Sequence, residues 1–160
     1  MIDLGAGSDE GYGGAGRDTV FGGRRADYVS GGPGADLLFG DGGSDWLVGD
    51  AGDDTINGGE GADLLGGAAG SDVLNGGKGA DTFIVERWGA GLDLIVDFEP
   101  GVDEIDVVDF RFASQDAVLS LAIQTGDDVL IRLSGSVSVR LLDTQLEDLR
   151  PSDFLIESAF

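Results

Sequence analysis

The sequence predicts an all-β protein, and three observations support this fold class. Nine consecutive blocks of nine residues run from Leu4 to Ile84, and most end in residues suited to a short strand. Of the 30 glycines, 25 lie in residues 1–84, so the composition changes sharply after these blocks. From residue 85 onward, short apolar runs separated by turn signals replace the repeat. We therefore expect two regions, a repeat array over residues 1–84 and a β-rich region over residues 85–160.

The repeat keeps a strict period of nine without an insertion. Its blocks read LGAGSDEGY, GGAGRDTVF, GGRRADYVS, GGPGADLLF, GDGGSDWLV, GDAGDDTIN, GGEGADLLG, GAAGSDVLN and GGKGADTFI. Every block has aspartate at its sixth place, and we name these residues the turn aspartates: Asp9, Asp18, Asp27, Asp36, Asp45, Asp54, Asp63, Asp72 and Asp81. Eight blocks have an apolar residue at the eighth place. A fixed period of this kind indicates a repeat architecture in which each block packs against its neighbours.

Three blocks depart from the pattern. The first has Leu4 at place one and Gly11 at place eight, so we expect a frayed or capping turn there. The third has Arg25 in place of the fourth-place glycine, which puts the conformation of its loop and its site in doubt. The eighth has Ala68 at place two, a milder change.

Charge and composition exclude several classes of function. The net charge of −22 with a pI near 4.1 disfavours nucleic acid and anionic lipid as partners and favours cations. The chain has no cysteine and no histidine, which excludes thiolate or histidine metal sites and histidine-based catalysis. It has no HExxH or GxSxG motif, and its carboxylates are too numerous to single out a catalytic pair. We expect no membrane span, because no stretch approaches about 18 apolar residues.

The blocks resemble the glycine-rich nonapeptide GGxGxDxUx of RTX (repeats-in-toxin) proteins. The resemblance implies a right-handed parallel β-roll in which the first six residues of each block form a turn and the last three a strand. Two blocks then make one coil, so turn aspartates that meet lie 18 residues apart on the same edge of the roll. The apolar eighth-place residues are expected to point inward between two parallel sheets.

The glycines and aspartates of each turn predict calcium sites. Glycine-rich turns expose carbonyl oxygens, and together with a carboxylate these form an all-oxygen site suited to calcium. The candidate side-chain ligands are the nine turn aspartates. The candidate carbonyl ligands belong to Gly14, Gly16, Gly32, Gly34, Gly43, Gly52, Gly59, Gly61, Gly70, Gly77 and Gly79. With one ion between each stacked pair of turns, the roll holds at most seven.

Calcium binding is expected to drive the folding of this region. Stacked carboxylates repel one another by about 3 kcal/mol per pair at an effective dielectric of about 20. With free calcium at about ten times the dissociation constant, each site adds about 1.4 kcal/mol of stability. The alternative interpretation of a tract rich in glycine and aspartate is a flexible acidic linker, and we expect this state without calcium. Asp41, Asp50 and Asp53 either add ligand oxygens or are solvated turn residues.

The second region has short expected strands in LDLIVDF, DEIDVVDF, VLSLAIQ, DVLIRL and VSVRLL, and one helical turn before Pro151. It resembles the region that follows the repeats in serralysin-type proteases and other RTX exoproteins. The resemblance implies a cap on the roll and a C-terminal signal for type I secretion, carried here by residues 153–156 and extended by Glu157–Phe160. Asp97, Asp103 and Asp106 either hold a further calcium ion or are polar residues at strand ends.

The function expected first is that of a non-catalytic calcium-binding module of a larger bacterial protein, exported by a type I apparatus and folded outside the cell, with an effector domain upstream. The alternative is a polysaccharide-binding module that resembles the repeat module of mannuronan C5-epimerases. Aromatic residues at seventh or ninth places suit either a sugar-binding strip or lateral packing: Tyr12, Phe21, Tyr28, Phe39 and Trp46. Only Arg24 and Arg25 form a basic cluster, so a polyanion would meet repulsion.

Overall fold

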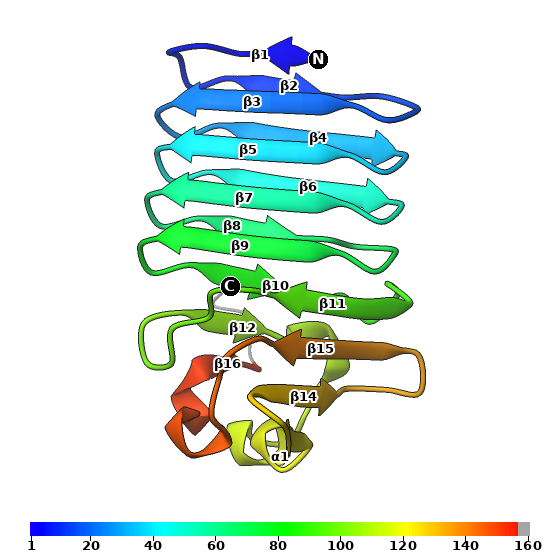
Figure 1. The fold of residues 1–160 in the computed structure, drawn as a ribbon, viewed down its shortest axis with the longest axis vertical. Helices are drawn as coiled ribbons and strands as arrows, with labels where there is room; N and C mark the ends of the chain where they lie inside the picture. Colours follow the sequence, from blue (N-terminus) through cyan, green and yellow to red (C-terminus); the bar gives the residue numbers. More distant parts are fainter. Residues whose placement is uncertain (157–160) are drawn as a thin grey trace.

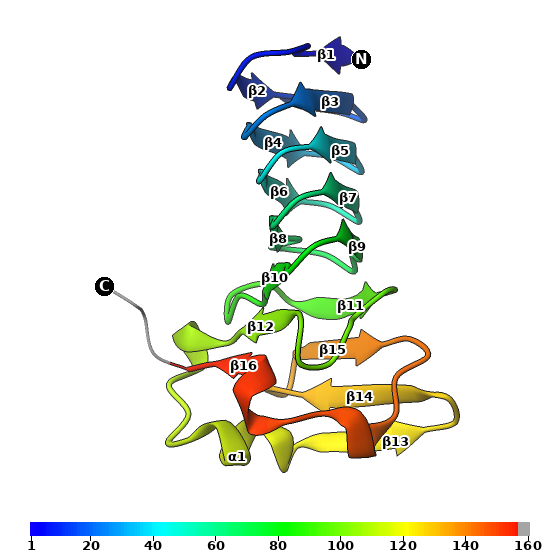
Figure 2. The ribbon, with the colours of Figure 1, turned by 90° about the vertical axis from the view of Figure 1, so that its left-hand side faces the viewer.

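A computed structural model describes residues 1–156, in which two β-sheets face each other along a ladder of stacked coils (Figures 1 and 2). The nine-stranded sheet has the order β1 (Ile2–Asp3), β3 (Thr19–Arg24), β5 (Leu37–Gly42), β7 (Thr55–Glu60), β9 (Val73–Lys78), β11 (Gly91–Ile95), β15 (Val137–Leu141), β14 (Asp128–Arg132) and β13 (Ala122–Thr125). The seven-stranded sheet has the order β16 (Phe154–Leu155), β12 (Glu104–Asp106), β10 (Thr82–Ile84), β8 (Leu64–Gly66), β6 (Trp46–Ala51), β4 (Tyr28–Pro33) and β2 (Glu10–Tyr12). The predicted all-β roll is confirmed.

Consecutive blocks alternate between the two sheets, so neighbouring strands of one sheet are 18 residues apart. Val20 pairs with Leu38, and Val29 pairs with Leu47, both in parallel register. The expectation of three-residue strands is wrong for six of the strands in the repeat. Strands such as β3 have six residues because pairing continues through the first three places of the next block, as between Gly23 and Asp41.

The eighth-place side chains form the core of the roll. They are at most 1% exposed in both sheets: Val20, Leu38, Ile56 and Leu74 in one, and Val29, Leu47, Leu65 and Phe83 in the other. Each such side chain stabilises the fold by about 1.5–3 kcal/mol through burial. Because successive side chains of a strand point to opposite faces, the eighth-place side chains all lie between the two sheets.

The first block closes the N-terminal end of this core. The Leu4 side chain occupies the space that a β-carbon on Gly11 would need, with Leu4 Cδ1 2.7 Å from that position. Leu4 is half-buried and packs against the core cluster. Of the two alternatives for this block, the structure therefore shows a capping turn.

The roll continues beyond residue 84, so the expectation that short apolar runs replace the repeat there is wrong, although the strict period of nine is lost. In β11, Ile95 pairs with Leu74, and in β12, Ile105 pairs with Phe83. Both continue the buried eighth-place column. Two more nonapeptides therefore follow, WGAGLDLIV at 88–96 and FEPGVDEID at 98–106. Three additional residues precede the first, and Asp97 precedes the second. The division at residue 84 stays a prediction, but strand pairing crosses it.

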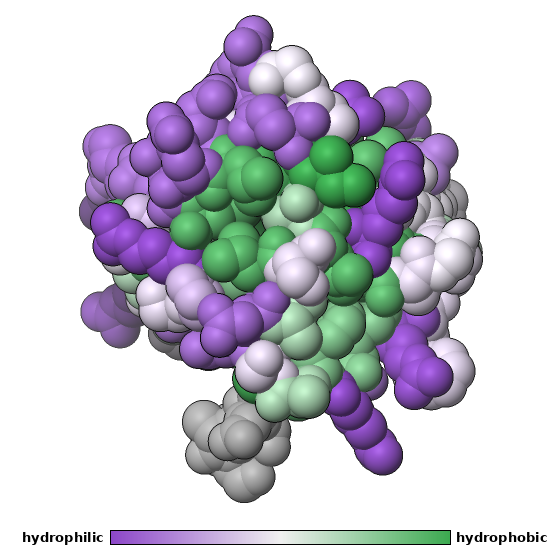
Figure 3. Space-filling model, turned by 90° about the horizontal axis from the view of Figure 1, so that it is seen from below, coloured by the Kyte–Doolittle hydropathy of each residue, from purple (hydrophilic) through white to green (hydrophobic). Residues whose placement is uncertain are grey.

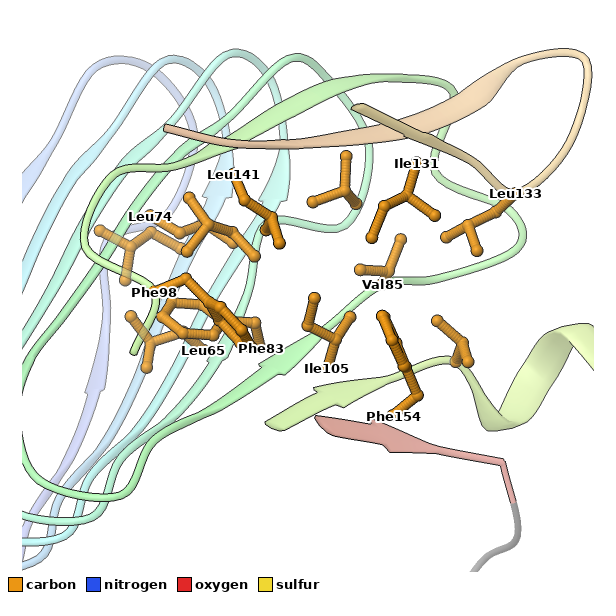
Figure 4. Packing of buried hydrophobic residues seen from close by; sticks show 14 of the residues in the cluster. Leu65, Leu74, Phe83, Val85, Phe98, Ile105, Ile131, Leu133, Leu141 and Phe154 are labelled. Carbon is orange, nitrogen blue, oxygen red and sulfur yellow. The ribbon is translucent and has the colours of Figure 1, made fainter. Parts of the chain in front are cut away.

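The remaining residues close the C-terminal end of the roll. Strands β13, β14 and β15 form an antiparallel extension of the nine-stranded sheet. The short helices are η1 (Val108–Phe110), α1 (Gln115–Leu119), η2 (Leu146–Asp148) and η3 (Pro151–Asp153). Buried side chains from these elements continue the core between the sheets, among them Ile131, Leu141 and Phe154 (Figure 4). Seen from this end, apolar residues gather at the centre and hydrophilic residues surround them (Figure 3).

Candidate metal centre

The turn aspartates form two columns, one along each edge of the roll. In each column, the backbone N–H of one aspartate donates a hydrogen bond to Oδ1 of the aspartate 18 residues later, for example Asp36 N to Asp54 Oδ1 at 2.7 Å. The same bond recurs in all seven stacked pairs at 2.7–2.9 Å. The predicted register, with aspartates 18 residues apart meeting on the same edge, is thus what the turns adopt.

The second carboxylate oxygen of most turn aspartates has no partner. Oδ2 is buried and accepts no hydrogen bond in Asp27, Asp36, Asp45, Asp54, Asp63 and Asp72. A buried polar atom without a partner is costly, and a buried anionic one is more so. Six such atoms at equivalent places indicate that the turns are built to hold a group that the protein chain does not itself provide.

No side-chain cation neutralises these carboxylates. Within residues 1–156, the ion pairs join Lys78 to Glu60 and Arg140 to Asp128, and neither includes a turn aspartate. Burial raises the pKa of Asp45 and Asp54 to about 6, against the lowering effect of the backbone hydrogen bond that each accepts. The stacked carboxylates therefore favour either a bound proton or a bound cation.

Backbone carbonyls supply further oxygens at the fourth place of the turns. Gly16, Gly34, Gly52 and Gly70 lie outside the strands, and within the described residues no N–H donates to their carbonyl oxygens. Each of these carbonyls instead faces the glycine at the corresponding place of the next turn on the same edge, closely enough that a β-carbon would collide with it. The place-two glycines of the candidate set differ, because Gly32, Gly59 and Gly77 belong to paired strands, whereas Gly14 lies outside the strands.

The turns fit a hard cation held between stacked pairs. In residues 1–156, no group of three or more acidic side chains converges on a single point, so a cation would depend on carbonyl oxygens as well as carboxylates. Donors that are all oxygen, of mixed carbonyl and carboxylate type, are the ligands that calcium prefers. The orphaned Oδ2 atoms and the unpaired place-four carbonyls are both of this kind. Their assignment as ligands, one by one, stays a prediction.

Blocks that depart from the consensus keep the conformation of the others. Arg25 has φ 78°, so it adopts the left-handed region in the position of a glycine. Asp41, Asp50 and Ala68 at place two likewise have φ between 65° and 74°. Asp53 Oδ1 accepts a hydrogen bond from Ser71 N at 2.9 Å, which links two turns at the surface. The third turn therefore keeps a left-handed backbone conformation at Arg25, although the residue is not a glycine.

The three further candidates all accept backbone hydrogen bonds. Asp97 accepts from Gly76 N at 2.9 Å and Gly77 N at 2.7 Å. Asp103 accepts from the backbone N–H of Asp81 at 3.0 Å and of Glu99 at 2.9 Å, one at each oxygen.

Asp106 lies apart from them and accepts from Val108 N at 2.9 Å. Asp103 thus continues one column of turn aspartates, and a role for any of the three as a calcium ligand stays a prediction.

The sequence reasoning missed Asp93, which continues the other column. Its Oδ1 accepts from Asp72 N at 3.1 Å. Burial raises the pKa of Asp93 to about 7. The signal was present as GAGLD in residues 89–93, which matches places two to six of the repeat after three additional residues.

Aromatic residues line the outer faces of both sheets near the N-terminal end. On the seven-stranded sheet, the ring centroids of Tyr28 and Trp46 lie 5.1 Å apart, and those of Tyr12 and Tyr28 lie 5.8 Å apart. Tyr12 and Trp46 are 59% and 48% exposed. On the nine-stranded sheet, Phe21 and Phe39 stack at 4.9 Å and are half-buried. The first group is an exposed strip, whereas the second packs laterally.

Comparisons with known proteins agree with this geometry. The model of the RTX calcium-binding nonapeptide repeat matches four times, over residues 3–38, 12–47, 39–74 and 48–83. No curated protein sequence matches the chain. No helix among residues 1–156 has the length and apolar character to cross a membrane.

Three solved structures are similar to the chain over 94% of its length. The AlgE6R3 and AlgE6R2 subunits of the Azotobacter vinelandii mannuronan C5-epimerase are 27% and 25% identical, with TM-scores of 0.54 and 0.53 over 80% and 93% of their own chains. The extracellular lipase LipA from Serratia marcescens is 15% identical with a TM-score of 0.58, and the match covers 39% of the lipase. The lipase supports the fold alone.

Proposed function

Because the chain belongs to the RTX calcium-binding nonapeptide repeat family, we propose that it is a non-catalytic module whose folding is coupled to calcium binding outside the cell. The observation that carries the proposal is the row of buried Oδ2 atoms without partners along the two columns of turn aspartates. Calcium supplies the positive charge that these oxygens lack. One ion between each of the seven stacked pairs of regular turns is the expected arrangement.

The chain itself contributes the frame in which those oxygens are held. From Asp27 onward, each turn aspartate is fixed by the N–H of the preceding turn on its edge, so its carboxylate is placed only when two turns have stacked. The ligands of one site therefore come from chain segments 18 residues apart, which are not close together in an unfolded chain. Binding and stacking are then one process, as in other small domains that fold on metal binding.

The difference in calcium concentration across the cell envelope decides whether the chain is disordered or folded. Extracellular calcium modules bind with dissociation constants of about 10⁻⁴–10⁻³ M, far above cytosolic calcium. With a net charge of −22, the chain is expected to stay a disordered polyanion inside the cell and to fold outside it.

The C-terminal segment supports export before folding. Asp153 and Phe154 of the proposed secretion signal are at most 1% exposed, and β16 pairs with β12. A receptor that reads these side chains must therefore meet them before the domain folds. We assign residues 85–156 the role of a cap that covers the open end of the roll, as part of a larger exported protein. Glu157–Phe160, the extension of the signal, lie outside the described residues.

Circular dichroism in the far ultraviolet tests the folding proposal. The spectrum in excess chelator is expected to be that of a disordered chain, and β structure is expected to appear cooperatively as calcium reaches about 0.1–1 mM. Magnesium at the same concentration serves as the control and is expected to leave the chain disordered. A β spectrum that chelator does not change would contradict the coupling of folding to calcium.

Binding of a polysaccharide is the second candidate function, and the exposed aromatic strip favours it. Tyr28 and Trp46 line a hollow beside the seven-stranded sheet, together with the turn aspartates Asp9, Asp27 and Asp45 and with small serine and alanine side chains. Aromatic faces with nearby hydroxyls are typical of ligand sites. The mannuronan C5-epimerase subunits support a ligand of the alginate type, whereas the charge of the chain favours a neutral glycan.

Retention on immobilised glycan in calcium distinguishes these ligands. Trp46→Ala is expected to abolish retention, and Trp88→Ala, which removes an 81% exposed tryptophan elsewhere, is the matched control. Retention on alginate resin but not on a neutral glycan would favour the epimerase-like function. Equal elution of the unmodified chain from glycan resin and bare resin would exclude both.

A further inference from the structure

The nonapeptide at residues 88–96 lies outside the repeats that the family model matches, which end at residue 83. Its strand β11 pairs in parallel with β9, and Leu94 N donates to Asp72 O at 2.8 Å. The same bond joins regular turns, for example Val73 N to Asp54 O at 2.9 Å. Residues 88–93 therefore stack on the turn of residues 67–72 as the regular turns stack on one another.

The glycines of this turn repeat the contacts of the regular turns. A β-carbon on Gly91 would collide with the carbonyl of Gly70, just as one on Gly70 would collide with the carbonyl of Gly52. A β-carbon on Gly89 would likewise collide with the carbonyl of Ala68. Gly89 and Gly91 lack the positive φ of the regular turn glycines, so the shared feature is the stacking and not the backbone dihedral angles.

The carboxylate of Asp72, in the first of these two turns, keeps an oxygen that lacks a partner. Asp72 is fully buried, and its Oδ2 accepts no hydrogen bond. Asp93, which is 9% exposed, places Oδ1 on the backbone N–H of Asp72 at 3.1 Å. The carbonyl of Gly70 faces Gly91 of the second turn and accepts no hydrogen bond within the described residues. The arrangement of oxygens matches that between regular turns.

We propose that residues 88–93 are a tenth cation-binding turn, which binds one calcium ion together with residues 67–72. This ion is additional to the seven expected from the regular blocks, and the proposal rests on the proposed function. Trp88 occupies place one of this turn, where the regular turns have glycine or, in the first, leucine.

The two edges of the roll end differently, at Asp93 on one edge and at Asp103 on the other. On the opposite edge, Asp103 stacks on Asp81 in the same way, but both of its oxygens accept backbone hydrogen bonds. A β-carbon on Gly101 of that turn would collide with the Arg150 guanidinium, and Gly101 N donates to Asp153 Oδ1 at 3.1 Å. Protein groups thus close that edge, and we assign it no ion.

The number of bound calcium ions per full-length chain, measured by titration calorimetry, tests this asymmetry. Asp93→Asn keeps an oxygen for the Asp72 hydrogen bond but removes the charge, and the chain is expected to bind one ion fewer. Asp103→Asn, the matched control on the other edge, is expected to keep the full number. An unchanged number in Asp93→Asn, or an equal loss in both variants, would overturn the proposal. An unmodified chain that binds no calcium would instead refute the proposed function.

Terbium luminescence gives a second readout that does not depend on the ion count. The chain has two tryptophans, so in a Trp46→Phe background Trp88 alone transfers selectively excited tryptophan energy to bound terbium. Adding Asp93→Asn to this background is expected to lower the terbium emission at least twofold, whereas adding Asp103→Asn is expected to leave it unchanged. Equal emission from the background and its Asp93→Asn derivative would overturn the proposal even if the calorimetric variant failed to fold.

Discussion

The side chain of Leu4 fills the space above Gly11, with Cδ1 2.7 Å from where a β-carbon on Gly11 would lie. The two departures of the first block from the repeat are thus complementary, since the missing eighth-place side chain is replaced from the block's own first place. The first block therefore covers the core at this place with a side chain of its own.

We expect Gly11→Ala to displace Leu4 and to lower the free energy of unfolding in saturating calcium by about 1–2 kcal/mol, comparable to exposing part of a leucine. Denaturant unfolding at fixed calcium measures the change. Gly135→Ala is the matched control, because a β-carbon there meets open space. Equal unfolding midpoints for the two variants would mean that Leu4 does not need the space above Gly11.

Loss of an interior turn aspartate is expected to be more harmful than loss of a terminal one. Asp54 stacks with both Asp36 and Asp72, whereas Asp9 stacks only with Asp27. In a one-dimensional array, an interior defect removes two nearest-neighbour interactions and a terminal defect at most one. Asp54→Ala should therefore raise the calcium midpoint of folding several-fold more than Asp9→Ala, and should lose more ions by calorimetry. A larger effect of Asp9→Ala would contradict the assignment of sites to stacked pairs.

Place-four glycines allow a test of how closely the turns stack. Gly52 has φ 137°, and a β-carbon there would collide with the Gly34 carbonyl, whereas Gly16 has φ 112° and nothing within 4 Å. Gly16→Ala should cost about 1–3 kcal/mol from backbone strain alone. Gly52→Ala should cost clearly more, because it also separates two turns, and its calcium midpoint should rise accordingly. Equal losses in denaturant unfolding at fixed calcium would show that the carbonyl contact has little effect on stability.

Without calcium, acidification is expected to favour the folded roll. Burial raises the pKa of Asp45, Asp54 and Asp81 to about 6, above the ordinary value of 3.8, so the folded state holds these protons more tightly than the unfolded state. The stability of the calcium-free chain should therefore rise as pH falls from about 7 toward 4. Circular dichroism in chelator should show more β structure at about pH 5 than at about pH 7.5.

Calcium binding is expected to have the opposite pH dependence, because protons compete for the same carboxylates. The calcium midpoint should rise as pH falls through about 6. If the calcium midpoint does not change with pH at about pH 6, calcium and protons do not compete for the turn aspartates.

Residues 1–84 alone are expected to respond poorly to calcium. Ending the chain there exposes Phe83 and Leu74, and leaves β9 and β10 as open parallel edges. Exposed ends and unpaired edges destabilise repeat arrays. Calcium titration followed by circular dichroism should give a higher midpoint for residues 1–84 than for the full chain, with residues 1–106 in between. The same midpoint for all three would show that the region after the repeats is dispensable for folding.

Much of the roll follows from the sequence because its determinants are local and periodic. The eighth-place residues from Val20 to Phe83 are buried as the period predicts, and the turn aspartates meet 18 residues apart. Each block repeats the same short-range requirements, glycine where the backbone turns and an apolar residue where the strand faces inward. A pattern repeated nine times determines both the strands and their register.

The tertiary structure alone decided what happens where the period breaks. Three additional residues before Trp88 and one additional residue, Asp97, shift the numbering, so sequence spacing no longer shows that Asp93 and Asp103 continue the two columns. Their positions depend on hydrogen bonds between chain segments 21 and 22 residues apart, because the extra residues are accommodated between strands that keep their pairing. The same holds for the closure of one edge by Arg150 and Asp153, about 50 residues from Gly101, since contacts at that separation are set by the packing of the whole end of the roll.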